Sequence, residues 1–196
     1  MSREGFFELF ESLLDREGTV TMGELLDRGG PDRVYGLGIV VLSATAFIPG
    51  VTNILALGIV GLGVQMVMGR ARPWLPERLL RAKLHRGRIK DIFAKAGRFL
   101  ERLGPRATPR PLPQRLMGFL VTWTALLLAL PLLLPFSNLL PGAALLMMGI
   151  ALLEDRPLAA WLGLGGSLAT TAYFLVSFDL VMKGLRAALH FRHIFE

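Results

Sequence analysis

Two apolar segments of this chain are each interrupted by helix-breaking and polar residues, and each then resumes. The first interruption covers residues 49–53 and the second runs from Pro135 to Gly142; both contain proline, glycine and asparagine. A helix broken inside an apolar segment leaves backbone groups without partners, and membrane proteins tolerate this where the backbone is buried in protein or lines a cavity. The pattern therefore predicts an all-α, polytopic membrane protein with two repeated broken helices, each re-entrant or a hairpin.

Composition supports that class. Of the 196 residues, 53% are hydrophobic and only 19% are charged, with a mean hydropathy of +0.51. Such a chain is more apolar than an ordinary soluble domain. It has no cysteine, and its three histidines lack the spacing of a metal centre, so we expect no metal and no cofactor.

Charge divides the chain into five parts. Residues 1–33 carry 4 basic and 8 acidic side chains and predict two short amphipathic helices in a cytoplasmic or interfacial leader. Residues 34–69 carry no charge, but the break leaves legs of about 24 Å, short of a bilayer core of about 30 Å. They predict the first broken-helix hairpin.

Residues 70–115 hold 14 Lys/Arg and three acids, so we expect this loop to be cytoplasmic. Part of it has one apolar and one basic face, which predicts a helix in the membrane interface. Nucleic acid is a weaker candidate partner, because the basic patch lies between two membrane hairpins and has no recognition motif. We expect contacts with anionic lipid headgroups from four side chains: Arg88, Lys95, Arg98 and Arg102.

Residues 116–182 predict the second broken-helix repeat and a final span over 157–182, followed by a short basic tail, 183–196. If 139–153 crosses the bilayer, this tail lies outside; if it is re-entrant, the tail returns to the cytoplasm. The charge rule favours the re-entrant alternative. Asp179 lies four residues before Lys183, which predicts an interfacial ion pair.

The two breaks also define a candidate site. An offset of 86 residues places Pro49 on Pro135, Gly63 on Gly149 and Arg70 on Arg156. Polar side chains beside the breaks could satisfy freed backbone groups, cap the next helix or bind a ligand, and these alternatives remain open. The candidate binding residues are Thr52, Asn53, Gln65, Ser137 and Asn138, and the predicted breaks are Pro49, Gly50, Pro135, Pro141 and Gly142.

Helical spacing also places Gly58, Gly61, Gln65 and Gly69 on one face, where another helix could approach closely. A homodimer would bury such glycine faces. The sequence contains no Ser/His/Asp set, paired intramembrane carboxylates or phosphate-binding loop, so we expect no enzymatic activity.

Two segments, 64–76 and 130–141, together with Leu-Leu-Glu-Asp at 152–155 and residues 22–27, resemble the ExoD family of bacterial membrane proteins associated with exopolysaccharide synthesis. The resemblance implies a role linked to exopolysaccharide production. Together with the charge pattern, we expect a multi-pass inner-membrane protein with its N-terminus and basic loop in the cytoplasm. We interpret the chain as a protein that binds or moves a small solute or ion at the paired breaks. The alternative is a scaffold that holds polysaccharide-synthesis proteins at the membrane.

Overall fold

The computed structural model describes residues 19–21, 30–45, 52–70, 73–74, 83–85, 112–130 and 138–192. The helices in these ranges are α3 (Pro31–Thr45), α4 (Thr52–Val67), α7 (Gln114–Ala129), α8 (Leu139–Glu154) and α9 (Pro157–Arg192). Strands β1 (Thr19–Thr21) and β2 (Lys83–His85) pair antiparallel. The all-α prediction is confirmed for the body of the protein. The strand pair is an exception to the all-α prediction, since no strand was expected.

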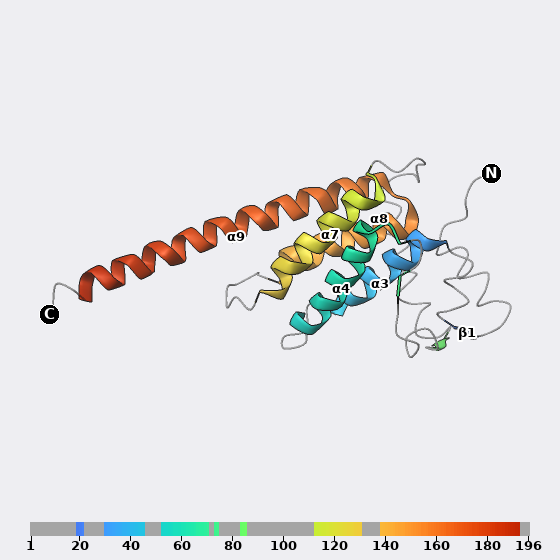
Figure 1. Ribbon diagram of the computed structural model, residues 1–196, viewed down its shortest axis with the longest axis horizontal. Helices are drawn as coiled ribbons and strands as arrows, with labels where there is room; N and C mark the ends of the chain where they lie inside the picture. The colour runs from blue at the N-terminus through green and yellow to red at the C-terminus, as the bar shows by residue number, and fades with distance from the viewer. Residues whose placement is uncertain are drawn as a thin grey trace.

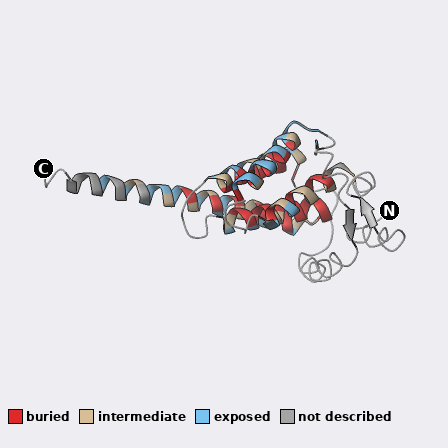
Figure 2. Cartoon of the chain, turned by 90° about the horizontal axis from the view of Figure 1, so that it is seen from below, coloured by how far each residue is buried: buried red, intermediate tan, exposed pale blue. Residues whose placement is uncertain are grey.

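The four shorter helices form a closed ring. Helices α3 and α4 make one antiparallel hairpin, and α7 and α8 make a second; α3 also packs along α8, and α4 along α7. Helix α9 lies outside the ring against α8 and α7, and its C-terminal half continues beyond the ring (Figure 1). Buried residues line the faces where helices meet, whereas the outer faces are largely exposed (Figure 2).

Glycine lets α3 and α8 touch through their backbones. A Cβ atom on Gly36 would lie 2.7 Å from the Leu153 nitrogen and 2.8 Å from the Gly149 carbonyl oxygen, and a Cβ on Gly149 would lie 3.1 Å from the Gly36 oxygen. Backbone atoms of a packed helix cannot move aside as a flexible side chain can. Only glycine therefore fits at both positions without moving a helix.

The contact between α4 and α7 repeats this arrangement. A Cβ on Gly63 would lie 3.0 Å from the Gly118 oxygen, and one on Gly118 would lie 2.9 Å from the Gly63 oxygen. Gly118 follows Gly36 by 82 residues, and Gly149 follows Gly63 by 86. Each hairpin thus contributes its first leg to one contact and its second leg to the other. The two hairpins are equivalent units packed reciprocally.

The predicted glycine face of α4 is not the face that packs against α7. Gly58, Gly61 and Gly69 are exposed, and a Cβ on Gly61 would have no neighbour within 4 Å. No backbone atom of another described helix lies within 4 Å of a Cβ built on Gly58, Gly61 or Gly69. Burial of this face in a homodimer stays a prediction. Gly63, outside the predicted set, makes the close contact.

Two predicted helix breaks lie inside a helix. Pro141 and Gly142 are buried in the first turn of α8. The first-turn N–H groups have no intrahelical acceptor, so proline costs little there. The Gly142 N–H donates to the Asn138 carbonyl at 3.0 Å, where the helix is already regular. The other predicted breaks, at Pro49, Gly50 and Pro135, lie outside the described residues.

Helix α8 runs back along the whole of α3. Asp155, just after α8, lies 3.9 Å from Arg33 in the first turn of α3. Residues 139–153 thus form one continuous leg that packs along α3. The re-entrant alternative concerns their position in a membrane and stays a prediction. Helix α9 starts at the end of the ring where α3 and α7 start, and it ends beyond the opposite end (Figure 1).

One described helix is long and apolar enough to cross a membrane, judged by length and composition: Pro157–Leu180 of α9, with a hydropathy of 1.3. The other apolar helices named by the same measure, α4, α7 and α8, have 16 residues each. At 1.5 Å per residue they are about 24 Å long.

The glycine contacts predict a contrast between two neighbouring positions of α4. We expect Gly63→Ala to lower the free energy of unfolding by about 1–3 kcal/mol, because the new methyl group meets backbone atoms of α7. Gly61→Ala is the matched control and should leave stability unchanged or raise it by up to about 1 kcal/mol, since alanine favours helix. Thermal unfolding of the purified variants measures both. Equal stability of the two variants would contradict the packing described here.

Candidate functional site

The predicted polar site is divided by the structure. We call the end of the ring where α3 and α7 finish and α4 and α8 begin the break end. Thr52 is only 2% exposed at the start of α4, Asn53 is exposed, and Asn138 is partly buried just before α8. Thr52 and Asn138 are equivalent at the 86-residue offset, so both hairpins place a polar residue here. Ser137 lies outside the described residues.

The capping alternative can be examined at Asn138. It is the N-cap of α8, but its side chain makes no capping hydrogen bond, and its φ of −94° and ψ of −25° are already helical. A typical N-cap residue has an extended conformation that aims its side chain at the helix N–H groups. Capping therefore does not account for Asn138.

Gln65 does not join this site. It lies near the other end of α4, 13 residues from Thr52, or about 20 Å along the helix. Its Nε2 donates to the Gly61 carbonyl at 3.1 Å, and its Oε1 accepts from the Trp74 backbone N–H at 2.6 Å. The Gln65 side chain thus connects the backbone at Trp74 to α4 by a hydrogen bond.

Between its ends the ring is filled with apolar side chains. The buried hydroxyls described here bond to their own helices: Ser43 donates to the Ile39 carbonyl at 2.6 Å and Thr124 to the Leu120 carbonyl at 2.8 Å. Thr124 also bonds Ser167 of α9 at 2.7 Å. The large side chains that are fully buried in the core include Ile39, Ile59, Met66, Leu128, Leu145, Met148 and Leu152.

The opposite end of the ring carries four arginines, and we call it the arginine end. Arg33 and Arg115 lie in the first turns of α3 and α7, and Arg70 and Arg156 follow α4 and α8. Sequence reasoning matched Arg70 with Arg156 but did not treat this end as a site. The missed signal is the shared pattern Pro-x-Arg-x-x-Gly, which occurs at 31–36 and again at 113–118.

Left-handed residues hold two of these arginines in place. Gly69 has a φ of 70° and Asp155, at the equivalent position, has a φ of 54°. After α4 the Arg70 N–H donates to the Gln65 carbonyl at 3.1 Å and the Gly69 N–H to the Met66 carbonyl at 3.0 Å. This is the Schellman arrangement, which ends a helix in one turn. Aspartate can take the left-handed conformation at modest cost.

We define the Asp155 corner as Asp32, Arg33, Glu154, Asp155 and Arg156. Arg33 Nη2 lies 3.9 Å from Asp155 Oδ2, with side chains only 12% and 6% exposed. Glu154 is also buried. Charges removed from water in this way require close opposite charges or hydrogen bonds, and this corner supplies both signs.

We define the Gly69 corner by the equivalent positions Met68, Gly69, Arg70, Gln114 and Arg115. A Cβ on Gly69 would lie 3.7 Å from Arg115 Nη2, so this guanidinium approaches the chain where Arg33 approaches Asp155. The Tyr35 hydroxyl donates to the Arg70 carbonyl at 3.1 Å and ties the corner to α3. Two buried nitrogens have no hydrogen-bond partner within the described ranges, Gln114 Nε2 and Arg156 Nε, one at each corner.

Two further observations concern other charged groups. The predicted pair on α9 is confirmed, with Lys183 Nζ 2.7 Å from Asp179 Oδ2 on exposed side chains. Within the described ranges, no group of three His, Cys, Asp or Glu side chains could hold a metal ion. The predicted headgroup contacts Arg88, Lys95, Arg98 and Arg102 lie outside those ranges.

In its described part the protein belongs to a class of helical proteins built from two reciprocally packed hairpins and one longer helix, α9. The family described as "Exopolysaccharide synthesis, ExoD" matches residues 8–176. The chain belongs to the ExoD family, which confirms the resemblance seen in its sequence.

One similar relative is the Protein ExoD of Rhizobium meliloti (strain 1021). It is 29% identical over 137 residues, which cover 66% of this chain and 57% of the relative. The matched region therefore spans little more than half of that relative's length. No solved structure matches the chain.

The buried ion pair can be tested against an exposed one. Asp155→Asn keeps a residue that accepts the left-handed conformation but removes the charge facing Arg33, so we expect a loss of about 1–3 kcal/mol in unfolding free energy. Lys183→Gln breaks the exposed pair and should cost less than about 0.5 kcal/mol. Denaturant unfolding compares the two, and equal effects would show that the Asp155 pair does not stabilise the protein.

Proposed function

We propose that this protein is embedded in the bacterial inner membrane and supports exopolysaccharide production without enzymatic activity. The observation that carries the membrane assignment is the apolar outer surface of the ring. Ile54 on α4 is 71% exposed, and large apolar side chains are exposed on every described helix. Examples are Leu57 and Val64 of α4, Phe119, Trp123 and Leu126 of α7, and Trp161, Leu168, Leu175 and Phe178 of α9.

Lipid is the environment that suits such a surface. Soluble monomers rarely expose contiguous apolar patches beyond a few hundred Å². The apolar window of α9 is only 33% buried, whereas a core helix of a soluble protein with this composition would be mostly covered. Hydrocarbon around α4, α7 and α9 removes the cost of exposing these side chains to water.

The arrangement of the helices suggests an orientation. Region 70–115 joins α4 to α7 and so leaves and re-enters the ring at the arginine end. Its 14 basic residues favour the cytoplasmic side. The break end then lies deep in the membrane, because legs of about 24 Å do not reach across a core of about 30 Å. The 24-residue apolar window of α9 is about 36 Å long and can cross completely.

This orientation makes a topological prediction that differs from the charge rule applied to the tail alone. A cysteine added after Glu196 should react with an impermeant thiol reagent in intact spheroplasts, whereas Glu101→Cys should react only after lysis. The chain has no native cysteine, so the signal is unambiguous. Reaction of both positions only after lysis would contradict a crossing by α9, and release of the protein by alkaline carbonate would contradict the membrane assignment itself.

Two modes of action are compatible with a membrane protein of this family. The first is binding of a small solute or ion at the break end, supported by the equivalent positions of Thr52 and Asn138 at two helix N-termini. The second is a scaffold that holds polysaccharide-synthesis proteins through basic region 70–115. It is favoured by the apolar filling of the ring, which offers no polar route along its axis among the described residues.

Exopolysaccharide yield in a strain lacking its own copy separates the two modes. If solute binding matters, Thr52→Val with Asn138→Ala should reduce yield severalfold, while the triple neutralisation Lys95→Gln, Arg98→Gln and Arg102→Gln should leave it near normal. The scaffold mode predicts the reverse. Asn53→Ala serves as a control at an exposed neighbouring position, and immunoblots verify equal protein levels. Normal yield from both test variants would exclude both modes.

A further inference from the structure

The two corners of the arginine end differ in one systematic way. Both keep their arginines: Arg33 and Arg156 at the Asp155 corner correspond to Arg115 and Arg70 at the Gly69 corner. The acids are not kept. Asp32 corresponds to Gln114, Glu154 to Met68 and Asp155 to Gly69.

The charge balance of the two corners is therefore opposite. At the Asp155 corner the Arg33 guanidinium lies 3.9 Å from the Asp155 carboxylate, whereas the residues that define the Gly69 corner include no acid. No ion pair joins Arg70 or Arg115 to another residue in the described part of the chain. The Gly69 corner thus has both arginines but lacks the acids that stand at the equivalent positions of the Asp155 corner.

Helix α7 adds further positive potential to the Gly69 corner. Its first turn contains no acid, whereas Asp32 occupies the first turn of α3. Its N-cap is Pro113, which makes no side-chain capping bond. The Gln114 Nε2 donor is buried without a partner among the described residues. Unsatisfied N–H groups and the helix dipole both favour an anion at such a terminus.

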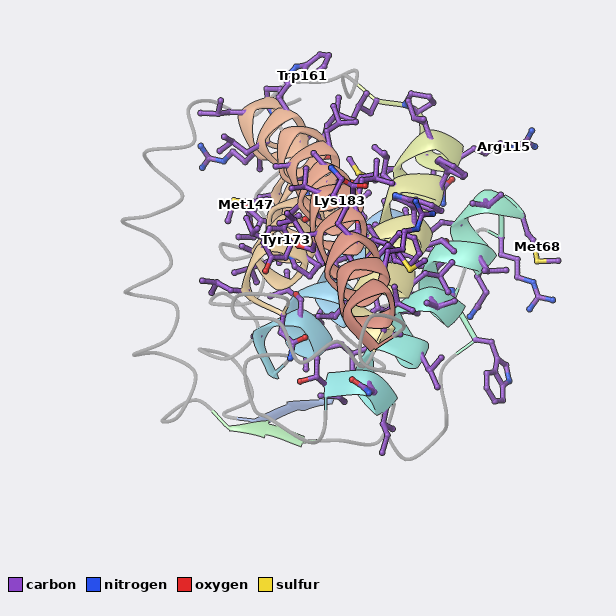
Figure 3. The ribbon with its side chains drawn as sticks, turned by 90° about the vertical axis from the view of Figure 1, so that its left-hand side faces the viewer. Met68, Arg115, Met147, Trp161, Tyr173 and Lys183 are labelled. Atoms are coloured by element: carbon purple, nitrogen blue, oxygen red, sulfur yellow. The ribbon has the colours of Figure 1, made fainter. Side chains whose placement is uncertain are left out.

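The Gly69 corner is also accessible. Met68, Gly69, Arg70 and Arg115 are all exposed. The side chains of Arg115 and Met68 point outward on the same side of the molecule (Figure 3). A ligand can therefore reach the guanidinium of Arg115 without any change in the helices.

We propose that the Gly69 corner binds a phosphoryl group, whose oxygens take the place relative to Arg115 that the Asp155 carboxylate takes relative to Arg33. Guanidinium matches phosphate oxygens with paired, charge-assisted hydrogen bonds. Gly69 leaves the space that a ligand oxygen needs, because it has no side chain between Arg115 and the chain. Two sources carry this chemistry, a free phosphate or pyrophosphate and the phosphate of an anionic lipid headgroup.

Substituting Gly69 provides a direct test. Gly69→Asp restores the internal carboxylate found at position 155, in a conformation that aspartate already adopts there. It should weaken binding of a phosphoryl ligand about tenfold, because it competes for Arg115. Gly69→Asn has nearly the same shape without the charge and should bind like wild type. Arg115→Gln should match Gly69→Asp without touching the left-handed residue.

Binding is measured on the full-length protein in a non-ionic detergent at low salt. One arm titrates sodium pyrophosphate by calorimetry, and the other titrates short-chain phosphatidylglycerol against phosphatidylcholine. Lys183→Gln at the far end of α9 controls for net charge, since it removes one positive charge and should change affinity less than twofold. Thermal unfolding of each variant verifies that it is folded.

Loss of pyrophosphate binding alone in Gly69→Asp and Arg115→Gln would assign the site to a free phosphate. Loss of phosphatidylglycerol binding alone would assign it to a lipid headgroup, and loss of both would support a general phosphoryl site. The proposal is overturned if these variants bind both probes like wild type, or if Lys183→Gln weakens binding equally. The pyrophosphate arm does not depend on the membrane assignment, so the two proposals can fail separately.

Discussion

Backbone contact between helices at two pairs of glycines determines the rest of this structure. Gly36 against Gly149 and Gly63 against Gly118 allow the carbonyl oxygens of one helix to approach the Cα atoms of the other. These contacts join the first leg of each hairpin to the second leg of the other, which closes the ring. They also set the position of each helix along the axis of its neighbour, so that both breaks lie at one end of the ring and all four arginines at the other. A side chain at any of these glycines would separate the helices that bring those groups together.

The ring has an approximate two-fold relation between its hairpins, but the chemistry of its two corners does not follow that relation. One corner pairs Arg33 with the Asp155 carboxylate, and at the other corner Arg70 and Arg115 are exposed. Helix α9 packs against α8 and α7. Binding can therefore take place at one of two equivalent positions while the other serves stability. The asymmetry comes from substitutions at the ends of helices, where they change charge without disturbing the packed interior.

Sequence reasoning found the repeat, the positions of the hairpins and the offset that relates α4 to α8. The offset of 82 residues that relates α3 to α7 was not predicted, because the two repeats were aligned at their breaks and not at the helix starts, Pro31 and Pro113. The close contact at Gly63 could not be predicted, because a helix that is apolar on all sides carries no information on its own orientation. Pro141 was predicted as a break because proline breaks a helix interior, but proline is accepted in a first turn. Three-residue strands such as β1 are too short to have a recognisable alternation.

The two offsets, 82 and 86 residues, have a consequence for how the repeat can change. Their difference is close to one turn of an α-helix, and the extra residues fall between Thr45 and Thr52 in one hairpin and their equivalents in the other. A length difference at that point changes the connection without shifting the contacts near the helix starts. The arginine end has kept its spacing and varied its side chains, whereas the break end has varied its length. The two hairpins thus differ in chain length at the break end and in side-chain charge at the arginine end.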